Sequence, residues 1–333
     1  MKILAVQMKR IGDLILTTPA FGLLKERTSV AYLTVAVHES AASLLPALPQ
    51  IDAAIVFGRS RGWTPWQQVL TGGFDAVFDF TETDRSALVS VISRAGERVT
   101  FSSVTDKRWR SRGYTRFVDS KVRERHTIDH YCALAQALPG GEIPRPRAPE
   151  LRLPLGGKSI QIAAGSVVVH PFTARPEKNW PPERWASVIE HCIAKGFSCV
   201  LTGGDSPDEQ RHHAGIRAAL ERTTSGGASV LNLAGQTDLL GLADLISQAA
   251  LVISCDTVAV HLAAAFQRPQ IALFGPTNPF HWRPRHDRAI VISAARPESP
   301  LTDFQPRMRG APMERISTEV VIRATDTLFA LAP

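Results

Sequence analysis

Short hydrophobic runs alternate with longer amphipathic stretches along most of the chain, which predicts parallel β-sheets covered by helices. Strands are expected at residues 3–7, 31–37, 53–57, 76–80, 167–170, 198–202, 230–233, 251–254 and 270–274. Between 185 and 193, apolar residues recur at i, i+3, i+4, i+7 and i+8, the stripe of an amphipathic helix. A further helical stripe at 317–331 ends the chain. The pattern predicts an α/β protein with doubly wound domains.

The chain has 333 residues, which exceeds one ordinary domain and favours two. A segment rich in Pro and Arg at 143–154, IPRPRAPELRLP, interrupts the alternation and is expected to be the linker. We therefore predict one doubly wound domain at 1–155, a second at 156–316, and a separate C-terminal helix within 317–333.

Positive charge is concentrated in the first half of the chain. Residues 1–158 contain 22 Lys and Arg against 15 Asp and Glu, whereas residues 159–333 contain 16 of each. A basic domain favours an anionic partner, such as a phosphorylated or carboxylated sugar or a membrane surface. A solvated basic surface with no specific partner is the alternative. We do not expect nucleic acid as a partner, because no nucleic-acid-binding motif accompanies the charge.

Composition also indicates the compartment. No apolar run has the length of a membrane span, and the opening MKILAVQMKR resembles a first strand more than a signal peptide. The four cysteines lack the spacing of a metal site and lie in apolar surroundings, so reduced core thiols are expected. We expect a cytoplasmic protein without a metal site.

The most informative stretch is 251–282, LVISCDTVAVHLAAAFQRPQIALFGPTNPFHW. A buried strand leads through a polar turn into a small-residue helix, which places Asp256 and Thr257 at the carboxyl end of a parallel sheet. Open α/β sheets bind ligands at this edge, and the free N–H groups of a helix N-terminus suit a phosphate. An ordinary helix N-cap at Asp256 or Thr257 explains the same residues equally well.

A second motif, QMKRIGDLILTTPAFGLLKE, opens the chain. Lys9 and Arg10 follow the first strand, and Gly12 leads into an apolar helix with Asp13 at its first turn. A carboxylate at this edge of the sheet is where a general base would lie. The alternative is a carboxylate that only stabilises the helix N-terminus through the helix dipole.

A third motif, VVVHPFTARPEKNWPPERW at 167–185, follows a strand with Thr173, Arg175 and Lys178 on a loop. One hydroxyl and two cations at this position suit a diphosphate, although a plain charged surface loop has the same composition.

The next predicted strand ends in LTGGDSPDE. Gly203 and Gly204 allow close approach of the backbone, and Asp205 is a candidate partner of a ribose hydroxyl. The pair His212-His213 has no companion ligands and is expected on a solvated helix surface.

Taken together, IGDLILTTP, HP…EKNWP…RW, the Gly-Gly turn and SCDT…HLAAAF…LFGPT…W resemble one family over nearly the whole chain: glycosyltransferase family 9, the ADP-heptose:lipopolysaccharide heptosyltransferases. The resemblance implies a GT-B fold, in which two Rossmann-like domains hold the active site in the cleft between them. The N-terminal domain would bind the acceptor and the C-terminal domain the nucleotide sugar. The last helix would pack back on the N-terminal domain.

The resemblance also implies roles for individual residues. Asp13 matches the general base, Lys178 the lysine that neutralises the leaving diphosphate, and Thr173 a hydroxyl on the same loop. Asp256, Thr257 and His261 match the motif that holds the sugar and the phosphates. The complete predicted donor set is Thr173, Arg175, Lys178, Gly204, Asp205, Asp256, Thr257, Val258 and His261, and the predicted acceptor set is Lys9, Arg10 and Gly12. Val258 stands where the family usually has Gly, which indicates a different pocket shape or substrate.

The function predicted from these motifs is inverting, metal-independent transfer of a heptose from ADP-heptose to an inner-core sugar of lipopolysaccharide, without a cofactor. The expected partners are this nucleotide sugar, an anionic core acceptor and, peripherally, the inner face of the inner membrane. One alternative is a related transferase that uses another nucleotide sugar, and another is a catalytically silent nucleotide-sugar-binding protein. An NAD-dependent dehydrogenase is disfavoured, because no GxGxxG follows the first strand.

Overall fold

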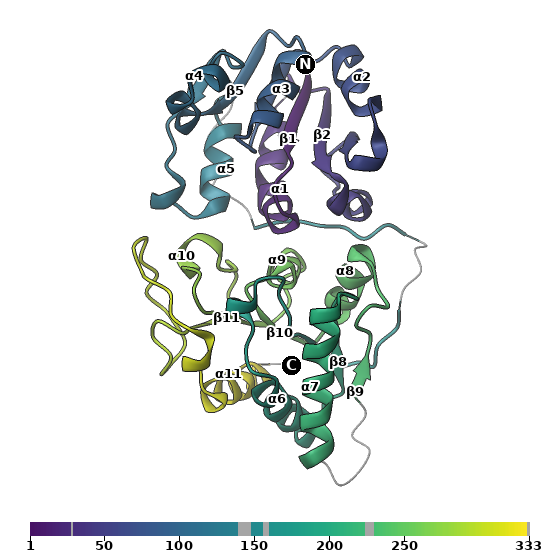
Figure 1. Ribbon diagram of the computed structural model, residues 1–333, viewed down its shortest axis with the longest axis vertical. Coiled ribbons are helices and arrows are strands. Elements are labelled where there is room, and N and C mark those ends of the chain that lie inside the picture. Colours follow the sequence, from purple (N-terminus) through teal and green to yellow (C-terminus); the bar gives the residue numbers. More distant parts are fainter. Residues whose placement is uncertain (28, 139–147, 156–159, 224–229, 332–333) are drawn as a thin grey trace. The chain divides into compact units, whose positions relative to one another are not determined.

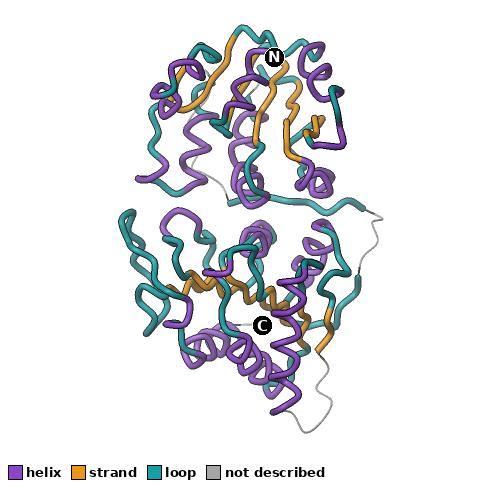
Figure 2. The backbone as a smooth tube through the Cα atoms, viewed as in Figure 1, coloured by secondary structure: helices purple, strands orange, loops and turns teal. Residues whose placement is uncertain are grey.

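A computed structural model describes residues 1–27, 29–138, 148–155, 160–223 and 230–331. The chain divides into two compact units, residues 1–152 and 153–333, each built around a six-stranded sheet (Figures 1 and 2). Part of the expected linker, 143–147, lies outside the described residues. Residues 148–152 belong to the first unit, where the Glu150 amide donates to the Thr18 hydroxyl at 3.1 Å.

The sheet of the first unit is entirely parallel, with the strand order β3-β2-β1-β4-β5-β6. Its strands are β1 (Lys2–Gln7), β2 (Tyr32–His38), β3 (Ala53–Phe57), β4 (Ala76–Asp79), β5 (Glu97–Phe101) and β6 (Arg116–Val118). This is the strand order of the Rossmann fold, in which ligands bind where the order reverses, here at the carboxyl ends of β1 and β4.

The connections in the first unit are helical. They are α1 (Ile11–Lys25), α2 (Thr64–Thr71), α3 (Asp84–Ile92), α4 (Arg108–Ser111) and α5 (Thr127–Ala135), with 3₁₀ turns η1 (Glu39–Ala47), η2 (Arg59–Arg61), η3 (Ser102–Asp106) and η4 (Val122–Glu124). Helix α1 is buried over most of its length and contains Pro19. Proline has no N–H to donate to the Ile15 carbonyl, and the Thr18 hydroxyl donates to that carbonyl instead, at 2.8 Å.

The second unit repeats the same architecture. Its parallel sheet has the order β12-β11-β10-β7-β8-β9, which is again the Rossmann succession, with its reversal between β7 and β10. The strands are β7 (Val167–His170), β8 (Cys199–Leu201), β9 (Val230–Asn232), β10 (Leu251–Cys255), β11 (Gln270–Phe274) and β12 (Ala289–Ser293). The helices are α6 (Pro182–Ala194), α7 (Pro207–Thr223), α8 (Leu239–Gln248), α9 (Val258–Ala265), α10 (Pro279–Trp282) and α11 (Thr318–Ala330), with turns η5 (Pro176–Lys178) and η6 (Met313–Arg315).

The C-terminal helix α11 packs within the second unit, beside α6 (Figure 1). Its Val321 and Leu328 lie in the same buried cluster as Trp180 and Trp185. The Phe329 ring stacks on Phe197 with centroids 3.8 Å apart. Packing of this helix on the N-terminal domain, which the family resemblance implied, remains a prediction. The apolar stripe of α11 is buried by the sheet and helix of its own unit.

The hydrophobic pattern located most of the strands. The expected strands at 53–57, 167–170 and 270–274 match β3, β7 and β11, and the stripe at 185–193 lies within α6, where its residues are buried or half-buried. Strands β5, β6 and β12 were missed. All four cysteines are buried thiols, as expected. In the described part of the chain, no helix is long and apolar enough to cross a membrane.

The packing of α11 makes a stability prediction. Val321 is fully buried, so Val321→Ala should leave a cavity and lower the free energy of unfolding by roughly 1–3 kcal/mol. Leu331→Ala, at a position that is 64% exposed, should change it by less than about 0.5 kcal/mol. Calorimetric melting curves of the full chain test both values. Equal melting temperatures for the two variants would contradict the packing described for α11.

Candidate active site

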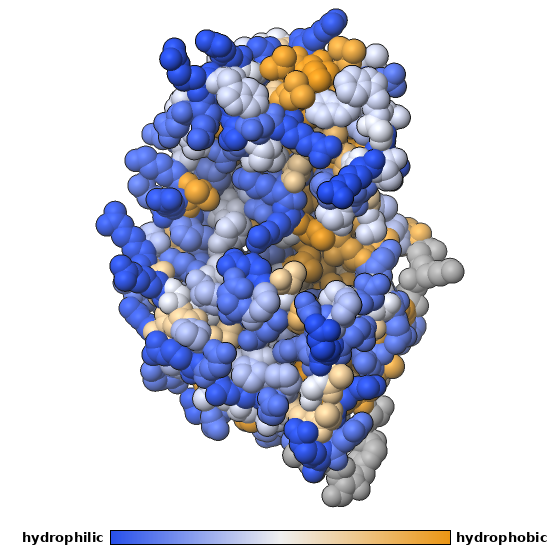
Figure 3. Space-filling view, in the orientation of Figure 1, coloured by the Kyte–Doolittle hydropathy of each residue, from blue (hydrophilic) through white to orange (hydrophobic). Residues whose placement is uncertain are grey.

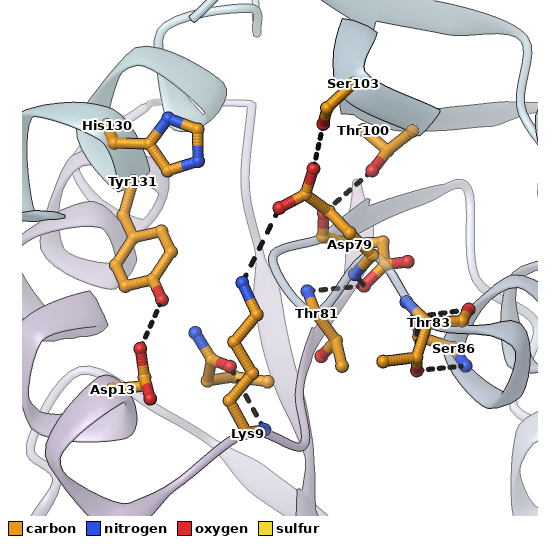
Figure 4. A network of polar contacts seen from close by, with 12 residues as sticks. Lys9, Asp13, Asp79, Thr81, Thr83, Ser86, Thr100, Ser103, His130 and Tyr131 are labelled. Carbon is orange, nitrogen blue, oxygen red and sulfur yellow. Dashed lines mark hydrogen bonds and ion pairs between the residues drawn. The ribbon is translucent and has the colours of Figure 1, made fainter. Parts of the chain in front are cut away.

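The predicted base Asp13 lies in the first turn of α1, just beyond the carboxyl end of β1. The hydroxyl of Tyr131, on α5, donates to the Asp13 Oδ1 at 2.7 Å (Figure 4). Burial of the phenol, together with the negative charge of Asp13, raises the pKa of Tyr131 well above its usual value. Tyr131 therefore stays a neutral donor that orients the carboxylate. A carboxylate offers about four lone-pair sites, so this hydrogen bond leaves capacity to accept a proton.

Lys9 reaches across the sheet edge from β1 to the loop after β4. Its Nζ lies 3.5 Å from the Glu82 Oε2 and 5.6 Å from the centroid of the Tyr131 ring. The Ser103 hydroxyl also donates to Glu82 (Figure 4). Lys9 was predicted to bind the acceptor, and the structure places it beside Asp13 and Tyr131 in one polar network. Glu82 was not predicted from the sequence.

A buried carboxylate holds the loop that carries Glu82. Asp79, at the end of β4, is fully buried and accepts from the Thr81 amide at 2.7 Å and from the Tyr114 hydroxyl. Burial raises the pKa of Asp79 despite these hydrogen bonds. The Thr81 hydroxyl in turn accepts from the Met8 amide at 2.9 Å, which ties the β4 loop to the end of β1. We interpret Asp79 as a structural anchor for the site.

Three further residues complete this edge. Arg10 occupies the N-cap position of α1 with an exposed side chain, and Gly12 lies within the first turn. His130, next to Tyr131, stacks on the Phe101 ring with centroids 3.8 Å apart. Burial and the nearby positive charges of Lys9 and Arg125 lower the pKa of His130 to about 3, so this ring remains neutral at physiological pH. Acceptor binding by Arg10 and Gly12 remains a prediction.

In the second unit, the predicted phosphate lysine forms a buried ion pair. Lys178 ends the turn η5 after β7, and Asp256 follows β10, so the two residues come from the strands that flank the sheet's reversal point. The Lys178 Nζ lies 2.5 Å from the Asp256 Oδ2, and the two side chains are 10% and 8% exposed. The structure thus joins two residues that the sequence placed in separate motifs, 78 positions apart.

Thr257 is the N-cap residue of α9, which agrees with the alternative interpretation of this motif as an ordinary helix N-cap. Its Oγ1 accepts from the Ala259 amide at 3.2 Å and lies 3.1 Å from the Ser254 hydroxyl. Val258 is the first residue of the helix and is half-buried, while His261 is buried in the next turn. Asp256 and the N-terminus of α9 are adjacent, so a phosphate that approached Lys178 would also meet the positive end of this helix dipole.

The loop before Lys178 is held by its own hydrogen bonds. The Thr173 hydroxyl donates to the Arg175 carbonyl at 2.8 Å, and the Thr173 amide donates to the Asn179 Oδ1 at 2.7 Å. Arg175 is exposed and pairs with Glu177, with 2.7 Å between Nε and Oε1. In this conformation Thr173 shapes the loop that positions Lys178, and a direct phosphate contact from its hydroxyl remains a prediction.

The Gly-Gly turn after β8 makes room for two buried side chains. A Cβ on Gly203 would come within 2.5 Å of both the Glu209 Oε1 and the His213 Nε2, and one on Gly204 within 2.8 Å of the Glu209 Oε2. Asp205 is exposed next to them. Burial raises the pKa of Glu209. Here the glycines are required by His213 and by Glu209, and Glu209 was not singled out from the sequence.

The expectation that His212-His213 lies on a solvated surface is wrong. His213 is 2% exposed, and His212 is half-buried against the Phe172 ring. His213 lies on the buried side of α7 together with Ile216 and Leu220. Burial and the neighbouring charges of His212 and Arg217 lower the pKa of His213 to about 4. His170, whose Nδ1 lies 3.1 Å from the Thr202 hydroxyl, has a pKa lowered to about 4 by burial and by His213.

These features define a class of protein. Each unit has the Rossmann strand order, and each places charged residues at the reversal point where this fold binds nucleotides and similar ligands. One site carries a carboxylate held by a tyrosine, and the other a buried lysine beside a helix N-terminus. Among the described residues, no group of three or more His, Cys, Asp or Glu is arranged to hold a metal ion. This is the organisation of an α/β protein with a charged candidate site at the reversal point of each Rossmann-like sheet.

Residues 63–311 match the family model of glycosyltransferase family 9 (heptosyltransferase), and the chain belongs to this family. Lipooligosaccharide heptosyltransferase 2 of Haemophilus ducreyi is 25% identical over 325 residues, covering 88% of each chain. Lipopolysaccharide heptosyltransferase 2 of Escherichia coli is 25% identical over 317 residues, again covering 88% of each.

Solved structures show the same fold. The Escherichia coli ADP-heptose lps heptosyltransferase II has a TM-score of 0.79 at 23% identity, covering 99% of each chain. The Escherichia coli heptosyltransferase WaaC with ADP has a TM-score of 0.77 at 22% identity, covering 98% of this chain and 100% of that one. The protein is therefore a glycosyltransferase of the GT-B fold with two Rossmann-like domains.

The buried histidines make stability depend on pH. The pKa of His213 is about 4 in the folded protein and near 6.5 when unfolded, so below pH 6.5 the unfolded state binds more protons. The contribution of His213 to the free energy of unfolding is therefore fully present above pH 6.5 and is lost as the pH falls towards 4. In urea titrations, His213→Gln should reduce the slope of unfolding free energy against pH by up to about 1.4 kcal/mol per unit. An unchanged slope would show that His213 titrates normally.

Proposed function

We propose that this protein transfers a heptose from ADP-heptose to an inner-core sugar of lipopolysaccharide. The observation that carries the proposal is the buried pair of Lys178 and Asp256 beside the N-terminus of α9, in a chain that belongs to glycosyltransferase family 9. The names of the similar proteins in Haemophilus ducreyi and Escherichia coli support the donor and the acceptor class.

The proposed reaction is a single displacement with inversion at the anomeric carbon. The acceptor hydroxyl attacks this carbon and gives its proton to Asp13, while the bond from the carbon to the β-phosphate oxygen breaks and ADP leaves. Negative charge grows on the β-phosphate during this step. We propose that Lys178 and the N–H groups of α9 stabilise that charge, and their adjacency supports a mechanism that needs no metal.

The Lys178–Asp256 pair balances charge in the proposed donor site. Asp256 compensates the charge of Lys178 in surroundings where an unpaired ammonium would be costly. We propose that the diphosphate takes over Lys178 on binding and that Asp256 then accepts hydroxyl hydrogens of the donor. In the other unit, Lys9, Arg10 and Gly12 are proposed to bind the anionic acceptor, beside Asp13 and Tyr131.

One alternative keeps the fold and changes the donor. Val258 begins α9 and is half-buried at the helix end where the sugar and phosphates would lie. A β-branched side chain narrows this position, which favours a nucleotide sugar of another shape. The other alternative, a binding protein without turnover, has less support, because Asp13 held by Tyr131 has the arrangement of a positioned base.

A turnover assay with several donors tests the proposed function. The protein is mixed with a heptose-free inner-core acceptor and with ADP-heptose, GDP-mannose or UDP-glucose in turn, and release of the nucleoside diphosphate is measured. We expect release of ADP that requires the acceptor. Release of a nucleoside diphosphate from GDP-mannose or UDP-glucose but not from ADP-heptose would support a transferase with another donor. Tight binding of a donor without release from any of them would support a binding protein without turnover.

Replacing Asp13 by Asn keeps the shape and the hydrogen bond from Tyr131 but removes the proton acceptor. The turnover number should fall by roughly 10²–10⁴-fold, while the affinity for ADP stays within about twofold. Glu319→Gln is the matched control, because Glu319 is an exposed carboxylate that also lies in the first turn of a helix, α11, and it should leave turnover near normal. Near-normal turnover in Asp13→Asn would remove Asp13 from the mechanism.

Lys178→Ala should weaken ADP binding and should lower turnover more strongly, by roughly 10²–10³-fold, because charge grows on the leaving group. Lys195→Ala, at an exposed lysine that follows α6, is the control and should have little effect on either. Wild-type turnover in the presence of EDTA should stay unchanged. A strict requirement for a divalent ion would contradict the proposed role of Lys178.

A further inference from the structure

One helical layer of the first unit exposes an unusual amount of apolar surface. Helices α2, α3 and α4 connect β3 to β4, β4 to β5 and β5 to β6, so each connection moves across the sheet in the same direction, towards β6. Because such crossovers between parallel strands are right-handed, all three helices lie on the same side of the sheet. Five large apolar side chains on these helices, or at the N-cap of α2, are exposed: Trp63 (67% exposed), Leu70 (43%), Leu88 (46%), Val91 (51%) and Trp109 (54%). We call this surface the α2–α4 face.

The α2–α4 face is continuous. Helices α2 and α3 contact each other, and Arg85 of α3 lies over the Phe57 ring, which packs edge-on against Trp66 of α2. On the other side, a Cβ on Gly113 would touch the Val91 side chain at 3.4 Å, so the segment after α4 lies against α3. Figure 3 shows hydrophobic side chains among hydrophilic ones on the first unit, at the end where the chain begins.

Positive charge surrounds these apolar side chains. The exposed cations on these helices and on the segments directly beside them are Arg59, Arg61, Arg85, Arg94, Lys107, Arg108 and Arg112. Of the nearby acids, Asp84 is engaged by Arg110, which also donates to the Glu82 carbonyl at 3.0 Å. The face therefore combines half-exposed aliphatic and indole groups with an excess of arginines.

Arg110 also connects the α2–α4 face to the candidate acceptor site. Glu82, whose carbonyl accepts from Arg110, also pairs with Lys9 through its carboxylate. Helix α3 begins directly after this residue, at Asp84. A partner bound on the α2–α4 face would therefore lie at the border of the network that contains Asp13 and Tyr131.

We infer that the α2–α4 face docks on an anionic lipid bilayer. Indole and aliphatic side chains enter the boundary between headgroups and acyl chains, and arginines bind lipid phosphates, so this combination suits a membrane surface. The choice of a lipid surface over an acidic protein rests on the proposed function, because a lipopolysaccharide acceptor carries a lipid. Docking there places such an acceptor next to Lys9 and Asp13 while the enzyme stays on the surface.

Co-sedimentation with vesicles tests this inference. Wild-type protein should bind vesicles of equal parts phosphatidylglycerol and phosphatidylcholine, bind much less to phosphatidylcholine alone, and dissociate as salt is raised. The double variants Arg108→Glu/Arg112→Glu and Leu88→Ser/Val91→Ser should each weaken binding by about tenfold or more. The controls Arg217→Glu/Arg222→Glu on α7 and Leu231→Ser on β9 make similar changes at exposed positions of the second unit and should bind like wild type.

Two results would overturn the inference. One is absent vesicle binding, or binding that the α2–α4 variants and the controls lose equally. The other is a dimer in light scattering that Leu88→Ser/Val91→Ser dissociates, which would make the face an interface between copies of the chain. ADP release with a lipid-free acceptor, measured on the same proteins, separates this test from the proposed function. The face variants should keep that activity, and its absence in wild type would count against the proposed function alone.

Discussion

The ion pair of Lys178 with Asp256 is the interaction on which the proposed donor site depends. Two opposite charges lie 2.5 Å apart with little exposure to water, and each makes the burial of the other acceptable. Strands β7 and β10 are neighbours in the sheet, which brings the loops after them to the same edge. A ligand that attracts Lys178 must compensate its charge as Asp256 does, and a diphosphate meets this requirement.

The same logic explains the first unit. Strands β1 and β4 are paired, and the loops that follow them carry Asp13, Lys9 and Glu82. The interior supports these groups from behind, with Tyr131 on Asp13 and the buried Asp79 holding the β4 loop. Both units therefore use one device, which is a charged group at the reversal point of a Rossmann sheet, positioned by a buried polar partner.

The sequence was sufficient for the fold class and for most strands, because those strands are short apolar runs between helical stripes. It missed β6 because this strand has three residues at the sheet edge, with Arg116 and Phe117 exposed, and so leaves no apolar run. The motifs identified Asp13, Lys178 and Asp256, whereas Tyr131 lies 118 residues from Asp13 on a helix with no motif. Sequence periodicity also cannot tell which sheet a helix covers, so the packing of α11 beside α6 could not be predicted from its apolar stripe.

A crystal structure of the protein with ADP tests the central claim most directly. The account predicts that the Lys178 Nζ leaves Asp256 and lies within about 3 Å of a β-phosphate oxygen, with the phosphate at the N-terminus of α9. ADP bound elsewhere, with the Lys178–Asp256 pair intact, would contradict it.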